Sequence, residues 1–177
     1  MDMGPAGELS LIGGWLKLHY ILNKGMAFGI SFGSLYGKLF LTLFRLAVIS
    51  LIIWSFIKLM KKAPPKGVLF AIALIIAGAI GNLLDSVFYG VLLDNAAYDS
   101  LTPWFHGQVI DMIYFDIWEG YLAEWIPFWG GMKIALLPIF NVADVSIFLG
   151  VLLLLINQKK IFKSGSSNNH LIHNTGA

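Results

Sequence analysis

The chain contains no cysteine and little charge. None of its 177 residues is Cys, and only 12% are charged, against 58% that are hydrophobic. Without cysteine there can be no disulfide, thiolate metal site or cysteine nucleophile, so any chemistry must use carboxylates, hydroxyls, amines, amides or the 4 histidines. Soluble domains carry about a quarter of their residues as charged side chains, roughly twice the fraction found here. These absences indicate a membrane protein with one domain.

Strong positive charge is also missing. The formal net charge is +2, and no basic run is longer than two lysines. Nucleic acid is therefore not an expected partner. His170 and His173 near the C-terminus are the only pair that suggests metal binding, and two ligands are too few for a site. We expect neither a metal nor another cofactor.

Three apolar segments are long enough to cross a bilayer. Each holds about 20 or more mostly apolar residues, or about 30 Å of helix at ~1.5 Å per residue, which matches the bilayer core. They are residues 39–60, 68–93 and 136–157. Pro64 and Pro65 follow the first segment, where a helix should stop. The expected fold class is therefore mainly α, an antiparallel bundle of transmembrane helices.

Lysines orient these spans. The connection at residues 58–67 has four lysines and no acid, and three more lysines follow the last span, so both places should be cytoplasmic. Residues 1–38 and 94–133 then lie on the extracytoplasmic side. The Ser-, Gly- and Asn-rich residues 164–177 should form a disordered cytoplasmic tail, which leaves residues 1–163 as the single membrane domain.

The two extracytoplasmic regions have different patterns. Residues 15–21 alternate in polarity, which predicts a strand in a small β element, and a glycine-rich stretch follows. The loop at 94–133 has six acids, one lysine and many aromatic residues, which is typical of a surface at the lipid headgroups. It is either an interface anchor or an amphipathic flap over a lipid-borne substrate. Because residues 1–38 contain no span, we expect a first helix to be missing from this sequence.

Polar side chains inside the expected spans are the candidate functional groups, because charge at membrane depth is costly. They are Arg45, Asn82, Asp85, Asn141 and Asp144. Asp144 would lie about 12 Å below the outer end of a span that starts at residue 136, at ~1.5 Å per residue, too deep to snorkel to water. Asn82 and Asp85 share one helix face, and so do Asn141 and Asp144. Hydrogen bonding between helices is the structural alternative, above all for Asn82.

Two glycines on the second span, Gly78 and Gly81, would let a neighbouring helix approach closely. A second carboxylate, Asp111, lies in the short apolar run at residues 108–113 of the outer loop. Two carboxylates in one poorly hydrated site do not both ionise easily, so one keeps a proton. The anion can activate water, and its protonated partner can polarise a carbonyl and protonate the leaving amine. Asp111 and Asp144 thus predict peptide hydrolysis, with the proton assigned to neither.

Four short blocks, in this order, resemble the motifs of lipoprotein signal peptidase, also called signal peptidase II. They are residues 23–29 (NKGMAFG), 81–85 (GNLLD), 107–111 (GQVID) and 140–144 (FNVAD). The resemblance implies an aspartic endopeptidase of the bacterial cytoplasmic (inner) membrane, with its active site towards the extracytoplasmic face. Such enzymes remove signal peptides from prolipoproteins just before a cysteine that carries diacylglycerol.

The resemblance also assigns roles to residues. It implies that Asp111 and Asp144 are the catalytic dyad. It implies that four further residues bind substrate or support the site, namely Asn23, Asn82, Asp85 and Asn141. The implied partners are lipid-modified prolipoproteins and membrane phospholipid, and no metal is required. In the family, the outer elements form a small sheet-like cradle and a flap over the site.

Two features depart from the family pattern. The family usually has an arginine directly after the aspartate of its second block, whereas this chain has Ser86. Arg45, Lys24 and His106 are the candidates to supply the missing charge. The expected but absent first span is the second departure, because in the family that span carries an Asp and a Lys near its outer end.

Three other functions compete with the peptidase. A small proton-coupled transporter or channel would also place Asp and Asn inside spans, but three or four helices without an internal repeat suit it poorly. A structural membrane adaptor would not need Asp144. A membrane serine protease would need a nucleophile elbow or a Ser/Lys pair on the outer half of a span. Hydrolysis that depends on both aspartates separates the peptidase from all three.

Overall fold

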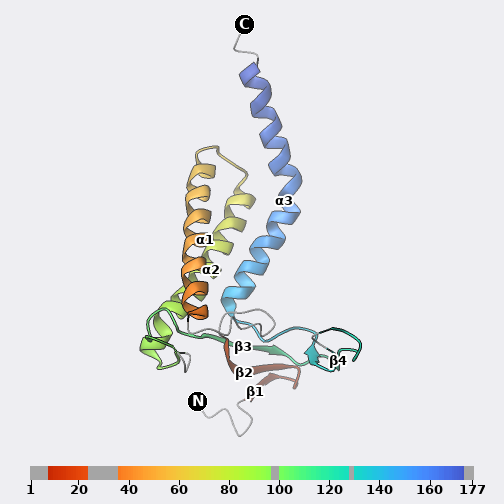
Figure 1. The fold of residues 1–177 in the computed structure, drawn as a ribbon. Coiled ribbons are helices and arrows are strands. Elements are labelled where there is room, and N and C mark those ends of the chain that lie inside the picture. The colour runs from red at the N-terminus through yellow and green to blue at the C-terminus, as the bar shows by residue number, and fades with distance from the viewer. Residues whose placement is uncertain (1–7, 24–35, 97–99, 128–129, 174–177) are drawn as a thin grey trace.

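Three helices and two small sheets make up the computed structural model of this chain, which describes residues 8–23, 36–96, 100–127 and 130–173. The elements follow each other as β1 (Glu8–Ile12), β2 (Leu16–Asn23), α1 (Gly37–Met60), α2 (Lys66–Leu92), β3 (Val109–Phe115), β4 (Glu119–Tyr121), β5 (Lys133–Ala135) and α3 (Val142–His173). The sheets lie across one end of the helices, and the turn between α1 and α2 lies at the other end (Figure 1).

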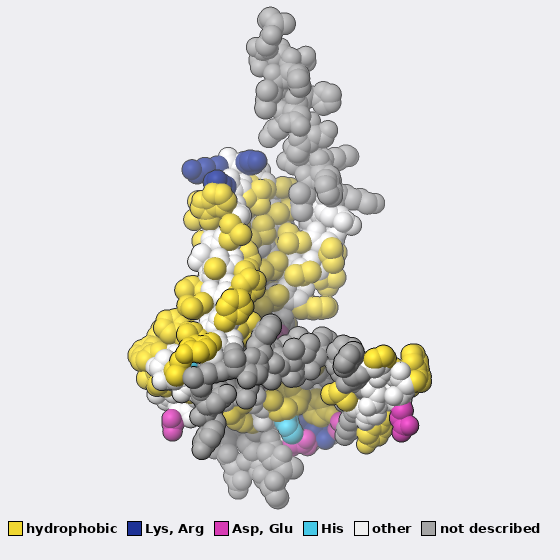
Figure 2. All heavy atoms as spheres, viewed as in Figure 1, with side chains coloured by type: hydrophobic (Ala, Val, Ile, Leu, Met, Phe, Trp, Pro, Cys, Tyr) yellow, Lys and Arg dark blue, Asp and Glu magenta, His cyan; other side chains and the backbone are white. Residues whose placement is uncertain are grey.

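The first two predicted spans are confirmed as helices. By length and composition, α1 and α2 are each long and apolar enough to cross a membrane. Their bounds agree closely with the segments 39–60 and 68–93, because a turn with Pro64 and Pro65 separates them. Large apolar side chains cover their outer surfaces, as Figure 2 shows, and Leu51 is 61% exposed. Such a surface suits a lipid environment.

The third helix differs from the expected span at both ends. It begins at Val142, because Pro138 lies in the preceding segment and Phe140 pairs with Ile113 of β3. Asp144 therefore lies in the first turn of α3, and the expectation that it lies eight residues into a helix from residue 136 is wrong. The apolar part of α3, Val142–Gln158, is shorter than α1 or α2.

At its other end α3 continues to His173. Residues 164–173 are helical there, where the sequence led us to expect a disordered tail. No proline lies between residues 158 and 173, so the backbone hydrogen bonds of the helix can continue. The last four residues, and the side chains of His170 and His173, lie outside the described part of the chain.

The larger sheet has the strand order β1-β2-β3, and both pairs are antiparallel. The strand predicted at residues 15–21 is confirmed as β2. The apolar run around Asp111 also forms a strand, β3, which the sequence analysis did not anticipate. Side chains alternate along a strand, so Asp111 shares a face with Phe115. Phe115 stacks on Phe140 at 5.7 Å between ring centroids, which places this face against the start of α3.

Small residues let α3 approach α2 closely, as Gly78 and Gly81 predicted. A Cβ atom on Gly78 would collide with the carbonyl oxygen of Ala143, and one on Gly150 would lie 2.6 Å from the carbonyl oxygen of Ala71. Ser146 adds a hydrogen bond from its hydroxyl to the carbonyl of Leu74, at 2.8 Å. This contact fixes the start of α3 beside the middle of α2.

The strands β4 and β5 form a separate antiparallel pair, which we call the outer arm (residues 117–137). In the described part of the chain, the backbones of these two strands lie close to no other helix or strand, but the hydroxyl of Tyr114 in β3 donates to Oε1 of Glu119 in β4 at 2.6 Å. The arm extends sideways from the sheet end of the helices (Figure 1). It presents Tyr121 with 75% and Trp125 with 81% of its surface exposed.

Candidate active site

Asp111 is buried on the helix-facing side of the sheet. Only 3% of its surface is exposed. Its Cα pairs with Ile21, and two pairs further along Val109 pairs with Asn23, so Asn23 and Asp111 are diagonal neighbours on one face. The Asn23 amide donates from Nδ2 to Oδ2 of Asp111 at 2.8 Å. Asn23 is the only residue of the first motif block that the structure describes.

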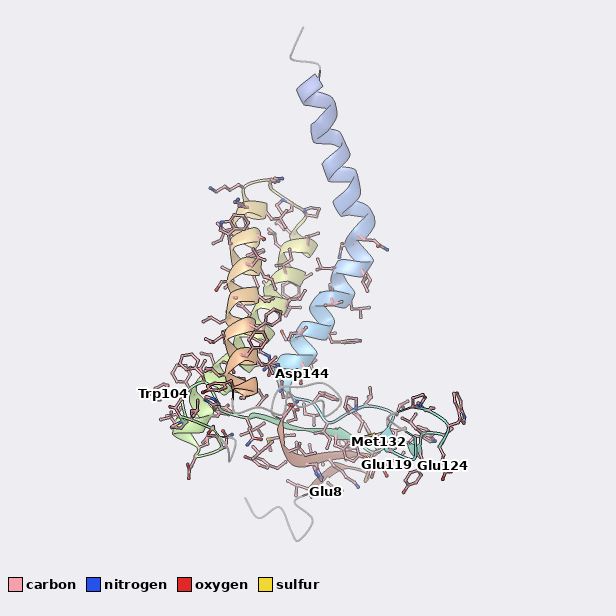
Figure 3. All side chains as sticks on the ribbon, viewed as in Figure 1. Glu8, Trp104, Glu119, Glu124, Met132 and Asp144 are labelled. Carbon is pink, nitrogen blue, oxygen red and sulfur yellow. The ribbon has the colours of Figure 1, made fainter. Side chains whose placement is uncertain are left out.

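Asp144 is fixed by the start of its own helix, where α3 meets the sheet (Figure 3). The backbone N–H of Asp144 donates to Oδ1 of Asn141 at 3.0 Å, and the backbone N–H of Asn141 donates to Oδ2 of Asp144 at 3.1 Å. This reciprocal pair is a capping box. The capping box therefore holds the Asp144 carboxyl group in a fixed position at the helix N-terminus.

Asparagine side chains join the two aspartates. Asn141 donates from Nδ2 to Oδ1 of Asp111 at 2.7 Å and to Oδ1 of Asn82 at 3.1 Å, which uses both of its amide hydrogens. Asn82 donates from its own Nδ2 to Oδ1 of Asp144 at 3.0 Å. Elements β2, α2, β3 and α3 thus contribute to a single hydrogen-bond network, which we call the aspartate network (Asn23, Asn82, Asp111, Asn141 and Asp144).

The surroundings of Asp111 favour its protonated form. Burial raises the pKa of Asp111 above its ordinary value. The amides of Asn23 and Asn141 act against this, because they donate to the carboxylate, whereas the negative charge of Asp144 raises the pKa further. The result is a raised pKa, as expected for one member of a pair of carboxyl groups that shares a site.

Asp85 is placed beside the aspartate network but not within it. It lies almost one turn after Asn82 on α2 and is half-buried. Among the described residues the hydrogen bonds of the aspartate network reach Asn82 but do not include Asp85. A Cβ atom on Gly107 would collide with the carbonyl oxygen of Asp85, so this glycine lets the loop before β3 pass close to α2.

Ser86 is fully buried and touches two cations from α1. Its hydroxyl donates to the carbonyl oxygen of Asn82 at 3.0 Å. The side-chain nitrogens of Lys38 and Arg45 each lie 3.4 Å from Oγ of Ser86. Of the three candidates to replace the missing arginine, Arg45 is therefore the one that reaches this position. Sequence reasoning missed Lys38, because the first span was expected to begin just after it.

The other two candidates do not reach Ser86 in the described part of the chain. Lys24 lies outside the described residues. His106 is 1% exposed, and its Nδ1 lies 2.8 Å from the carbonyl oxygen of Trp104. Its Nε2 is buried and has no hydrogen-bond partner among the described residues. No group of three His, Asp or Glu side chains in those residues is placed to hold a metal ion.

Comparisons with known proteins identify relatives of this chain. The chain matches the family model described as signal peptidase (SPase) II over residues 2–160. It is 46% identical over 160 residues to a lipoprotein signal peptidase of Amoebophilus asiaticus (strain 5a2), which covers 90% of this chain and 68% of that protein. It is 42% identical over 161 residues to a lipoprotein signal peptidase of Porphyromonas gingivalis. This match covers 85% of this chain and 70% of that protein.

A solved structure adds similarity in fold. It is described as a bacterial membrane enzyme determined by the in meso method at 2.3 Å resolution. Its TM-score with this chain is 0.51 at 26% identity, over 88% of this chain and 72% of that one. These matches confirm the resemblance that the four motif blocks suggested. The chain belongs to the signal peptidase II family, and it is a peptidase.

Proposed function

We propose that this protein removes signal peptides from diacylglyceryl-modified prolipoproteins by intramembrane aspartic hydrolysis. The observation that carries the proposal is the hydrogen-bond network that joins the buried Asp111 to Asp144. The names of the relatives, lipoprotein signal peptidases, support this class of substrate. Asn23, Asn82 and Asn141 orient the two carboxyl groups, and Asp85 supports the site from α2.

The proposed reaction is general acid–base catalysis. The raised pKa of Asp111 favours Asp111 as the member of the pair that holds the proton, so we assign the role of base to Asp144. Asp144 takes a proton from water, and the water oxygen attacks the scissile carbonyl while Asp111 donates a hydrogen bond to the carbonyl oxygen. The proton taken from water then passes to the leaving amine as the C–N bond breaks, and the pair returns to its starting state.

The proposed membrane orientation places this site at the outer leaflet. Lysines gather at the turn between α1 and α2 (Figure 2), whereas Asp144 of the aspartate network lies at the opposite end of the helices (Figure 3). By the positive-inside rule the lysine end is cytoplasmic, so the site faces the extracytoplasmic side of the bacterial inner membrane. The apolar part of α3 measures about 25 Å at ~1.5 Å per residue, near the thickness of a bilayer core, which supports a third span.

The outer arm has a proposed role at the membrane surface. A two-stranded sheet is only marginally stable in water, and the backbones of these two strands lie close to no other described helix or strand, although Tyr114 of β3 donates a hydrogen bond to Glu119. Its exposed Tyr121 and Trp125 are residue types that favour the lipid–water interface. We therefore assign the arm to the interface beside α3, where a lipid-borne substrate would enter, rather than to water.

The test is cleavage of a diacylglyceryl-modified prolipoprotein peptide by the purified protein in lipid bilayers, followed by mass spectrometry. Asp111→Asn and Asp144→Asn should each lower the cleavage rate about 100-fold or more, because each removes one acid–base group. Asp94→Asn is the matched control. Asp94 is exposed, and its φ of 52° suits Asn equally well, so this variant should cleave normally.

Three outcomes would contradict the proposal. Undiminished cleavage by either dyad variant would exclude catalysis by the pair. Equal cleavage of the same peptide without its lipid would exclude the proposed substrate class. If the wild-type protein cleaves neither peptide, the proposed activity on prolipoproteins is excluded for this chain.

A further inference from the structure

Two cations on one face of α1, Lys38 and Arg45, lie close to Ser86, which is hydrogen-bonded to Asn82 of the aspartate network. Lys38 and Arg45 are seven residues apart, close to two turns of helix, and therefore share a face. Lys38 is only 7% exposed although it carries an ammonium group. Burial of such a group is costly unless polar neighbours compensate for the lost water. The fold nevertheless brings both side chains to the same atom, Oγ of Ser86.

Ser86 connects these cations to the aspartate network. Its hydroxyl donates to the backbone carbonyl of Asn82, and the side chain of Asn82 in turn donates to Asp144. Asn82 also accepts from Asn141, which contacts Asp111. A shift of Ser86 would therefore move the residue that holds both Asn141 and Asp144. The positive charge of Arg45 also reaches Asp111, whose pKa it acts to lower against the larger effect of burial.

Thr42, which lies between the two cations on α1, fixes this face in place. Its hydroxyl lies 2.9 Å from the carbonyl oxygen of Phe105 and 3.0 Å from that of Lys38, and Thr42 is 1% exposed. The N–H of Gly107 donates to the carbonyl of Ser86 at 3.0 Å. The helix α1, the buried Ser86 and the loop that leads into β3 are thus held together, so the cations have little freedom to turn away.

We propose that Arg45 and Lys38 are positioning residues for the aspartate pair, acting through Ser86 and Asn82. The inference rests on the proposed peptidase function. It assigns to α1 a part in the reaction, although α1 contributes no group to the aspartate network itself. Lys38 is buried against Ser86, whereas Arg45 is half-buried and reaches Ser86 from a position two turns further along the helix.

The kinetic test compares Arg45→Met, Arg45→Lys and the control Lys58→Met in the cleavage assay. Arg45→Met should lower kcat about tenfold and leave KM within about twofold, because it disturbs the aspartates and not the bound peptide. Arg45→Lys should restore most of kcat, since it keeps the charge. Lys58 is on the same helix but stacks on Trp54 at the other end, so Lys58→Met should cleave normally.

A stability test needs no activity. The melting temperatures of the wild type, Arg45→Met, Asp144→Asn and the double variant form a double-mutant cycle. The inference predicts that the melting temperature of the double variant falls by less than the sum of the two single decreases. Once Asp144→Asn has removed the negative charge, the loss of the cation at residue 45 has a smaller effect. Simple additivity would overturn it.

Two further results would also overturn the inference, one from kcat alone and one from kcat together with the melting temperature. Wild-type kcat in Arg45→Met would exclude any role in positioning. A lower melting temperature with no recovery in Arg45→Lys would reduce Arg45 to a structural residue. Wild-type protein and the two aspartate variants are measured beside these. If they behave as the peptidase requires, a negative result at Arg45 counts against this inference alone.

Discussion

Asn141 serves two purposes at the residue scale. Its Oδ1 caps α3 and its Nδ2 holds Asp111 and Asn82, so one amide both starts a helix and joins the two carboxyl groups. The spacing of Asn141 and Asp144 was interpreted from the sequence as a shared helix face. The same spacing is also that of a capping box, and the preceding Pro138 favours this second interpretation. The sequence thus contained the signal for the helix start.

The two purposes of Asn141 can be separated by substitution. Asn141→Ser keeps a good capping residue but removes the amide donor, so cleavage should fall at least tenfold while the melting temperature changes little. Asn141→Ala removes the cap as well and should cost about 1 kcal/mol of stability in addition. Cleavage rates and thermal melts of the two variants check this. Equal stability of both, or normal cleavage by Asn141→Ser, would contradict it.

Asp111 should make stability depend on pH. Because its pKa is raised above 3.8, the folded protein holds this proton more tightly than the unfolded chain does. The contribution of Asp111 to stability is therefore greatest below about pH 3.8 and is lost as the pH rises through the raised pKa. The side chain in Asp111→Asn cannot ionise, so the stability of this variant should not fall with rising pH for this reason.

Thermal melts of both proteins in the same detergent, from about pH 3.5 to 7.5, measure this effect. The melting temperature of the wild type minus that of Asp111→Asn should fall across this range. A difference that stays constant or rises would show that Asp111 does not carry the expected penalty for ionisation.

At the element scale, hydropathy and proline predicted α1 and α2 because both signals are local. The partner of β3 is not local. Its pairing with β2 depends on a register that shifts between Leu18 and Ile21, and no pattern in either strand specifies that irregularity. The proximity of Asn23 to Asp111 could therefore be inferred only from the family resemblance, whereas the structure gives it a physical cause.

The α2–α3 contact offers a test at this scale. Gly78→Ala would drive a methyl group into the carbonyl of Ala143, which is backbone and cannot rotate away. The first turn of α3 would move with Asp144, so cleavage should fall about 100-fold and the melting temperature should drop. Gly81→Ala is the control, because its Cβ would lie 3.3 Å from the side chain of Ala143 and should be tolerated better. Equal behaviour of the two variants in both assays would contradict this explanation.

At the scale of the whole molecule, charge and aromatic content predicted a location for the outer arm but not its structure. They indicated a region at the membrane surface, and left an anchor and a flap as alternatives. Composition specifies neither the strand pairing nor the direction in which a loop leaves the fold. The structure shows a two-stranded arm directed away from the helices (Figure 1), which an aromatic count alone could not reveal.

The depth of this arm in a bilayer can be measured directly, because the chain has no native cysteine. A nitroxide spin label on Trp125→Cys should be more accessible to oxygen, and less to a water-soluble nickel complex, than a label on Ser10→Cys of β1. Leu51→Cys on α1 provides the reference inside the membrane. Electron paramagnetic resonance should place the label at residue 125 between the two references. Accessibility equal to that of Ser10 would assign the arm to water.

The aspartate network also determines when the site can exist during synthesis. Its hydrogen-bonded side chains are 88, 62, 59 and 30 residues apart along the chain. Asn23 is made early and Asp144 late, so the network cannot close before the start of α3 has left the ribosome. Such distant contacts also form slowly once the chain is complete. Under the proposed mechanism, the order of translation therefore keeps the growing chain inactive until α2 and the start of α3 are both in place.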